Sequence, residues 1–159
     1  MLPYCAQHTK TELGLVVKPS RIAGAGLGLF TAMDQEFQTD DLIAEVHGQR
    51  VTQAELDRRY GDFTAPYGVA LSKTVFEDGA TARYVGHFAN TQVNPAGTRS
   101  VQSGTNAKIS HNVAKRTVFL KATKRIPPDT EILVYYGKQY QFNEGTRYTT
   151  ARGFVRKNQ

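Results

Sequence analysis

Short apolar runs separated by turn residues dominate the chain and predict a protein built mainly from β-strands. The first run, LGLVVKPS, alternates between apolar and other positions and stops at Pro19, and the run DLIAEVHG stops at Gly48. Strands are predicted in six runs: residues 13–20, 27–32, 41–48, 67–72, 117–124 and 131–137. No repeat and no linker divides the chain.

The clearest helix signal lies in TQAELDRRYG, residues 52–61. Thr52 is a suitable N-cap, Glu55 follows at the spacing of a capping box, and Gly61 ends the pattern. Residues 90–104 are rich in Asn, Gly, Ser and Pro, so we expect an irregular segment there.

The composition describes a single folded domain. Of the 159 residues 40% are hydrophobic and 21% are charged, which is typical of a globular protein. No apolar run approaches the ~20 residues that a membrane-spanning helix needs, and the first ten residues lack the apolar core of a signal peptide. Cys5 is the only cysteine, which excludes an internal disulfide. We therefore expect an intracellular protein, nuclear or cytoplasmic, without membrane contact.

Charge is divided unevenly along the chain. Residues 1–79 contain 7 Lys and Arg against 11 Asp and Glu, whereas residues 80–159 contain 13 against 3. A basic half of this kind can attract nucleic acid. A basic face that only meets solvent explains the same numbers, so both interpretations stay open.

Three alternate glycines stand in SRIAGAGLGLF, residues 20–30, at positions 24, 26 and 28. A dinucleotide fingerprint counted from Gly24 would need a glycine where Leu29 stands, and no Gly-Lys-Ser/Thr phosphate loop is present. Glycines at this spacing let a backbone approach another group closely or adopt a positive φ angle. The segment is therefore either a tight turn or part of a pocket for another cofactor.

Three segments in a fixed order give the pattern a specific interpretation. They are PSRIAGAGLGLFTA at 19–32, GHFANTQVNP at 86–95 and PPDTEILVYYGKQY at 127–140. Together they resemble the motifs of the SET-domain family of protein lysine methyltransferases. The resemblance implies a mainly β SET fold of several small twisted sheets, few short helices and a C-terminal pseudoknot. It implies a SET domain at 14–142, an N-terminal extension at 1–13 and a basic, aromatic tail at 143–159.

The same resemblance implies an S-adenosyl-L-methionine-dependent protein-lysine N-methyltransferase acting on a histone or another protein, in a chromatin setting. Tyr136 would be the catalytic tyrosine that orients the amine. The residues implied to bind the cofactor are Ala25, Gly26, Leu27, Gly28, Tyr67, Asn90 and Thr91. The residues implied to line the substrate channel are Tyr84, Tyr136 and Tyr140. A homodimer, or the tail residues Phe142, Tyr148 and Phe154, would close the pocket.

The chemistry of such a site follows from the ionisation of lysine. A free lysine amine has a pKa near ~10.4, so it is almost entirely charged at neutral pH and is then no nucleophile. A narrow apolar channel disfavours the charged form and lowers that pKa. A tyrosine hydroxyl and backbone carbonyl groups can then orient the neutral amine.

Several positions depart from the family pattern. Thr91 and Gln92 stand where the family has His and Ser, and Val46 stands where many members have a tyrosine. These changes favour a second interpretation, a catalytically weak SET module that serves as a protein- or nucleic-acid-binding domain. Cys5 and His8 supply only two of the four ligands of a structural zinc site, so we expect no metal.

His87 has no assigned role in the site, and the favoured interpretation is a structural histidine. A nucleic-acid-binding β-domain that uses the basic second half is a third interpretation of the chain.

Overall fold

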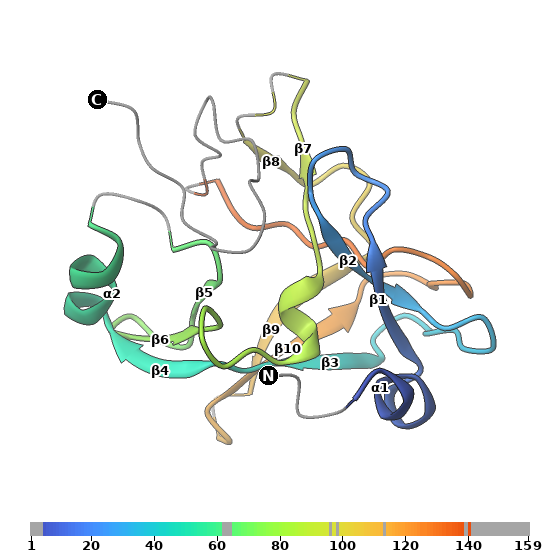
Figure 1. Ribbon diagram of the computed structural model, residues 1–159, viewed down its shortest axis with the longest axis horizontal. Coiled ribbons are helices and arrows are strands. Elements are labelled where there is room, and N and C mark those ends of the chain that lie inside the picture. The colour runs from blue at the N-terminus through green and yellow to red at the C-terminus, as the bar shows by residue number, and fades with distance from the viewer. Residues whose placement is uncertain are drawn as a thin grey trace.

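The computed structural model describes residues 5–61, 65–95, 97, 99–112, 114–138 and 140. Within these residues the fold consists of four small antiparallel sheets, two α-helices and one 3-10 helix. Figure 1 shows the sheets spread around the middle of the molecule, with α1 and α2 at opposite sides. The predicted tail at 143–159 lies outside the described residues, together with Phe142, Tyr148 and Phe154.

The first sheet is a hairpin of β1 (Leu15–Pro19) and β2 (Leu27–Thr31), in which Val17 pairs with Leu29. Helix α1 (Ala6–Leu13) precedes it. The helix ends because Gly14 adopts a φ of 64° and its N–H bonds to the carbonyl of Lys10 at 2.9 Å.

The central sheet has the order β3-β10-β9. Its strands are β3 (Leu42–Val46), β9 (Ala107–Asn112) and β10 (Thr117–Ala122). The middle strand β10 buries alternate residues, Val118 and Leu120, each 1% exposed. This alternation places one face of the sheet in the main core.

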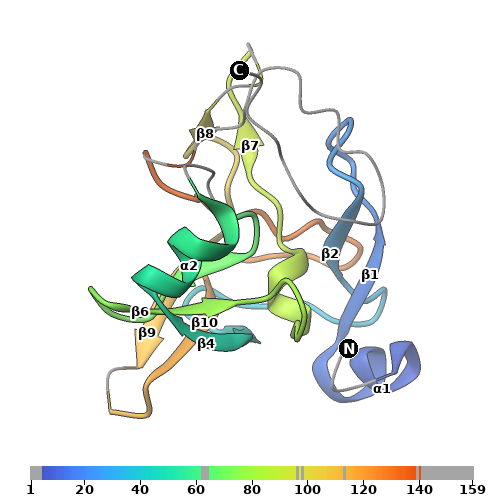
Figure 2. The same ribbon diagram turned by 60° about the vertical axis from the view of Figure 1, so that its left-hand side comes forward.

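The third sheet has the order β4-β6-β5 and carries α2. Its elements are β4 (Gln49–Thr52), α2 (Gln53–Tyr60), β5 (Gly68–Ala70) and β6 (Val75–Asp78). A small second core lies here, formed by Val51, Leu56 and Tyr60. Figure 2 shows α2 beside this sheet and α1 beside β1, away from it.

A short 3-10 helix, η1 (Val85–Phe88), leads from this sheet to the fourth one, formed by β7 (Gln92–Val93) and β8 (Ser100–Val101). The segment after residue 130 then returns into the middle of the fold. Ile132 donates to the carbonyl of Leu29 at 2.7 Å and Val134 to the carbonyl of Asn90 at 2.8 Å. Ile132 and Val134 are almost fully buried, so this segment joins the hairpin and η1 to the core.

Most predicted elements are confirmed. Strands lie within the predicted runs that begin at residues 13, 27, 41, 67 and 117, and α2 begins after Thr52 as predicted. The prediction of a strand over 131–137 was wrong, because its backbone partners change from residue to residue and leave only single bridges at Glu131 and Leu133. The segment 90–104 is less irregular than predicted, because it contains β7 and β8.

The helix α1 lies in the segment predicted only as an extension, and its weak signal explains why. It has no side-chain cap, and Thr9 is its single buried residue. The boundary between extension and domain at residue 14 stays a prediction. In the described part of the chain no helix has the length and apolarity needed to cross a membrane.

The N-cap of α2 gives a first test of this fold. The Thr52 side chain accepts a hydrogen bond from the backbone N–H of Glu55 at 3.3 Å. We expect Thr52→Ala to lower the free energy of unfolding by about 1 kcal/mol, because one helical N–H loses its partner. Urea unfolding measures this loss. Thr52→Ser keeps the hydroxyl and should stay near the wild type; an equal loss in both variants would contradict the capping role.

Candidate functional site

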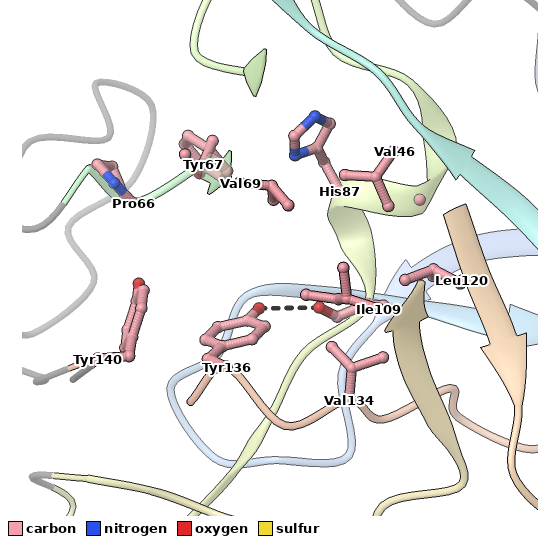
Figure 3. Close-up of a pocket in the computed structure, with 13 residues that line it drawn as sticks. Val46, Pro66, Tyr67, Val69, His87, Ile109, Leu120, Val134, Tyr136 and Tyr140 are labelled. Atoms are coloured by element: carbon pink, nitrogen blue, oxygen red, sulfur yellow. Dashed lines mark hydrogen bonds between the residues drawn. The ribbon is translucent and has the colours of Figure 1, made fainter. Parts of the chain in front are cut away.

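A mostly apolar pocket of about 110 Å³ lies where β5, η1 and the central sheet meet the segment around Tyr136. Its walls include Val46, Val69, Ile109 and Val134, with Tyr67, Tyr140, His87 and Ala89 among the remaining residues. Figure 3 shows these side chains around the ring of Tyr136. A pocket with apolar walls and few polar groups is the usual form of a small-ligand site.

The hydroxyl of Tyr136 is the polar group that the pocket holds in a defined direction. It donates a hydrogen bond to the carbonyl of Ala89 at 2.8 Å, drawn as the dashed line in Figure 3. The backbone N–H of Tyr136 donates to the Ser100 hydroxyl at 3.1 Å, and the ring of Tyr140 packs edge-on at 4.8 Å between centroids. The tyrosine is therefore held by its backbone, its ring and its hydroxyl.

Asn90, the residue after Ala89, joins this pocket to the glycine segment. Its side-chain nitrogen donates to the carbonyl of Leu27 at 3.0 Å and to the carboxylate of Glu131 at 3.3 Å. Its side-chain oxygen has no hydrogen-bond partner among the residues that the structure describes. Two adjacent residues thus contact both predicted parts of the site. Ala89 contacts Tyr136, and Asn90 contacts the glycine segment.

The glycines of the segment are required for two different reasons. Gly24 and Gly26 are exposed and have φ angles of 79° and 73°, and a Cβ atom at either would meet no atom within 4 Å. They give a turn with open space over its backbone. Gly28 is buried in β2, and a Cβ there would collide with the carboxylate of Glu131.

This turn fits the cofactor that the resemblance implies. S-adenosylmethionine is bulky and zwitterionic, and the exposed turn at Gly24 and Gly26 offers it room. The unpartnered oxygen of Asn90 can accept from an ammonium group. Ala25 is half-buried and Leu27 is 50% exposed, so both lie at the surface of the turn.

Glu131 organises the glycine segment, although no role was predicted for it from the sequence. It is 5% exposed, and its carboxylate accepts from the Ser20 hydroxyl at 2.6 Å and from the Arg21 backbone N–H at 2.8 Å. With Asn90 as a third donor, the buried carboxylate is well supplied with hydrogen bonds. The signal in the sequence was an acidic residue directly before the apolar run ILVYY.

His87 lies in the pocket wall and is held in its neutral form. Its pKa is lowered to about 4, chiefly by burial and secondly by the positive charge of Arg83. Its Nε2 atom is buried without a hydrogen-bond partner among the described residues. The ring packs against Gly79, where a Cβ atom would lie 2.7 Å from the ring. These contacts support the interpretation of a structural histidine in the wall.

Two of the predicted site residues are directed elsewhere. Tyr84 does not line the pocket with Tyr136; its ring packs edge-on against His47 at 5.0 Å, beside a separate cavity. The predicted place of Tyr84 in the same channel is therefore wrong. Thr91 is 4% exposed, and its hydroxyl shares a 2.6 Å hydrogen bond with Ser100, so its side chain is occupied within the protein.

Some of the other predicted residues lie close together. Tyr67, Tyr136 and Tyr140 line one pocket, and Asn90 contacts residue 27 of the predicted cofactor segment. Cys5 and His8 lie 3.2 Å apart at the surface. Among the described residues, no group of three His, Cys, Asp or Glu side chains is placed to hold a metal ion.

Comparison with solved structures identifies the fold. A crystal structure of the Chaetomium thermophilum polycomb repressive complex 2 (PRC2) matches 79% of this chain with 20% identity and a TM-score of 0.63. The structure of ctPRC2 in an autoinhibited conformation bound to S-adenosylmethionine matches 78% with 19% identity and a TM-score of 0.62. A humanized mutant of the Chaetomium thermophilum complex bound to the inhibitor GSK126 matches 77%, with 19% identity and a TM-score of 0.58.

In each case the match covers only 15% of the other chain. No family model and no curated protein matches this chain. The likeness confirms the SET fold that the three motifs implied, in a mainly β chain with few short helices. The segment 131–136 lies against residues 89–90 and against Ser100 and Asn106, which is the close approach that the expected pseudoknot requires.

The support that Glu131 gives the glycine segment can be tested by Glu131→Gln. The amide replaces one acceptor oxygen by a donor NH₂ that faces donors. We expect the free energy of unfolding to fall by about 1–3 kcal/mol. Hydrogen exchange of the Arg21 amide should also become faster. The exposed residue Asp34 offers a matched control, because Asp34→Asn removes a charge without changing this contact. Unchanged exchange at Arg21 would contradict the role of Glu131.

The lowered pKa of His87 predicts how stability depends on pH. Its pKa is about 4 in the folded chain and 6.5 without these surroundings, so between these values the unfolded chain binds a proton that the folded chain excludes. Stability should therefore decrease as the pH falls through this window, by at most about 1.4 kcal/mol per pH unit from this group.

The measurement is the free energy of unfolding at several pH values for the wild type and for His87→Gln. The variant lacks the titrating ring, so its curve should be flatter between pH 6.5 and 4. Parallel curves over this window would show that His87 is not held neutral.

Proposed function

We propose that the protein transfers a methyl group from S-adenosyl-L-methionine to the side-chain amine of a lysine in a protein. The observation that carries this proposal is the hydroxyl of Tyr136, directed at the Ala89 carbonyl across an apolar pocket and one residue away from the contact of Asn90 with Leu27. An amine in the pocket and a cofactor at the glycine turn would meet at this point.

The cofactor would be held by the glycine turn and by Asn90. S-adenosylmethionine supplies an electrophilic methyl group on a sulfonium when it is bound. Two observations support this assignment: the open space over Gly24 and Gly26, and the side-chain oxygen of Asn90, which has no hydrogen-bond partner among the described residues. That the similar ctPRC2 structure is bound to S-adenosylmethionine supports it further. Gly28 acts indirectly, by leaving space for the carboxylate of Glu131.

The pocket would hold the amine in a reactive geometry. The Tyr136 hydroxyl donates its proton to the carbonyl of Ala89, and a hydroxyl oxygen has two lone pairs that can accept a hydrogen bond from an amine N–H. The Ala89 carbonyl is a second acceptor beside it. Two acceptors on one side of an amine turn its lone pair the other way, toward the methyl donor, and exclude water from that side.

The substrate is proposed as a histone or another protein lysine, and the catalytic unit as residues 14–142. Tyr67 and Tyr140 would line the channel with Tyr136. Backbone contacts of Thr91 with the cofactor, a homodimer that closes the pocket and nucleic-acid contact through the basic half all stay predictions.

A second candidate function is a binding module of the same fold with little or no catalysis. It is favoured by the side chain of Thr91, which is buried against Ser100 and cannot replace the ring that the family has there. Val46, an aliphatic residue in the pocket wall, also leaves the channel with fewer aromatic side chains. Calorimetric titration with S-adenosylmethionine separates the two candidates, because a module without measurable cofactor binding cannot be the proposed enzyme.

The proposal is tested by incubating the purified chain with labelled S-adenosylmethionine and a panel of histones and other proteins. We expect label on a lysine. Tyr136→Phe should lower kcat by about a hundredfold or more, since the amine loses its orienting hydroxyl. Cofactor affinity should change little in this variant.

Tyr84→Phe is the matched control, because it removes the same atom from a tyrosine outside the pocket. It should leave kcat unchanged. Full activity of Tyr136→Phe would contradict the proposed role. Cofactor binding without transfer to any protein would favour the binding module.

A further inference from the structure

Arg83 lies against the wall of the pocket without lining it. Its guanidinium carbon is 3.7 Å from the ring centroid of Tyr67, and 5.5 Å from that of Phe88. Its Nε donates to the carbonyl of Gly79 at 2.9 Å. Two aromatic rings and a backbone carbonyl therefore fix the position of this cation.

The charge of Arg83 is not neutralised by an ion pair within the described residues. The two carboxylates of β6 are fully buried and already have partners. Glu77 pairs with Arg50 at 3.0 Å, and Asp78 pairs with Arg59 at 2.8 Å and accepts from a tyrosine hydroxyl. The positive charge of Arg83 is therefore available to act on the pocket.

The pKa of His87 shows how the charge of Arg83 acts inside the pocket. Burial is the largest cause of its low pKa, and the charge of Arg83 is the second. Hydrogen bonding with the His47 backbone and the charges of Asp78 and Glu77 act in the opposite direction and are smaller. These are the charged and polar groups that face the ring, and their net effect is that a cation is disfavoured in this wall.

We propose that Arg83 is a positioning residue of the pocket, whose fixed positive charge makes the pocket accept the target amine in its neutral form. This inference rests on the proposed function. The ammonium would give its proton to solvent as it enters. The lone pair that is left would bond the methyl carbon while the carbon–sulfur bond of the sulfonium breaks, and the electron pair of that bond would stay on the sulfur of a neutral thioether. Arg83 would act on the amine through space, from behind the Tyr67 ring that it contacts.

The same charge argues against the pocket as a binding site for methylated lysine. Tyr67, Tyr136 and Tyr140 have the composition of an aromatic cage, which attracts a methylammonium through the negative faces of its rings. A cation already stacked on Tyr67 opposes such attraction. The arrangement therefore favours a site that reacts with a neutral amine over one that retains a charged product.

The size of the effect follows from Coulomb's law. Two unit charges about 8 Å apart, at an effective dielectric constant of about 20, shift a pKa by roughly one to two units. At neutral pH such a shift changes the neutral fraction of a lysine by about tenfold or more.

Three variants distinguish an effect of the charge of Arg83 from an effect of the shape of its side chain. Arg83→Met keeps an apolar stem and removes the charge, and Arg83→Lys keeps the charge. Lys124→Gln removes an equal charge from an exposed residue at a different cleft. The first readout needs no activity: the titration of the His87 ring, followed by NMR. We expect its pKa to rise by about one unit in Arg83→Met and to stay near the wild type in the other two.

The second readout is the pH profile of kcat/KM with a lysine substrate found in the transfer assay. We expect the profile of Arg83→Met to move about one unit to higher pH, so that its activity is lost near neutrality and regained in alkali. Arg83→Lys should keep the profile of the wild type. A variant that merely loosens the fold would lose activity at every pH.

An unchanged His87 titration in Arg83→Met would overturn the inference. Equal shifts of the His87 pKa in Arg83→Met and Arg83→Lys would also overturn it, because they would show an effect of side-chain shape and not of charge. An unmoved pH profile in Arg83→Met would also overturn it. If the wild type transfers no methyl group to any protein, the proposed function fails, and the His87 titration alone then decides whether the charge of Arg83 reaches the pocket.

Discussion

The arrangement of the site depends on one buried carboxylate. Glu131 comes from the C-terminal part of the described chain, yet its donors are Ser20 and Arg21 before the glycine turn and Asn90 after η1. A carboxylate that is 5% exposed is costly unless it is fully hydrogen-bonded, so the three segments must lie where their donors can reach it. Because Gly28 has no side chain, β2 can pass directly beside the carboxylate.

Two consecutive residues then connect this cluster to the chemistry. Asn90 is held by Glu131 and Leu27, and the carbonyl of the preceding Ala89 accepts from Tyr136. A peptide unit is rigid, so a displacement of Asn90 would also displace the acceptor of the tyrosine hydroxyl. The positions of the glycine turn and of the pocket are therefore coupled through the backbone, although the two are not adjacent in the sequence.

The sequence predicted those parts of the fold that local rules determine. The cap at Thr52 and the alternating strand around Leu120 follow from capping chemistry and strand periodicity. The run after residue 130 looked like another strand, because its apolar residues are those of a buried segment. Its hydrogen-bond partners are Leu29 and Asn90, which local patterns cannot identify, and for the same reason Glu131 and Ala89 were missed. Tyr84 was misplaced because its position in the sequence does not determine the direction in which its ring points.

The polar groups of the pocket decide which form of an amine it can hold. The Tyr136 oxygen and the Ala89 carbonyl can accept hydrogen bonds from either an amine or an ammonium, so hydrogen bonding alone does not select between them. Selection must come from charge. The described lining contains a neutral histidine and neither Asp nor Glu, and an arginine outside the lining is stacked on the Tyr67 ring. The carboxylates of β6 lie outside the lining and are matched by Arg50 and Arg59. Such walls favour the neutral amine over the ammonium, and the neutral amine is also the nucleophile that attack on a sulfonium methyl group requires.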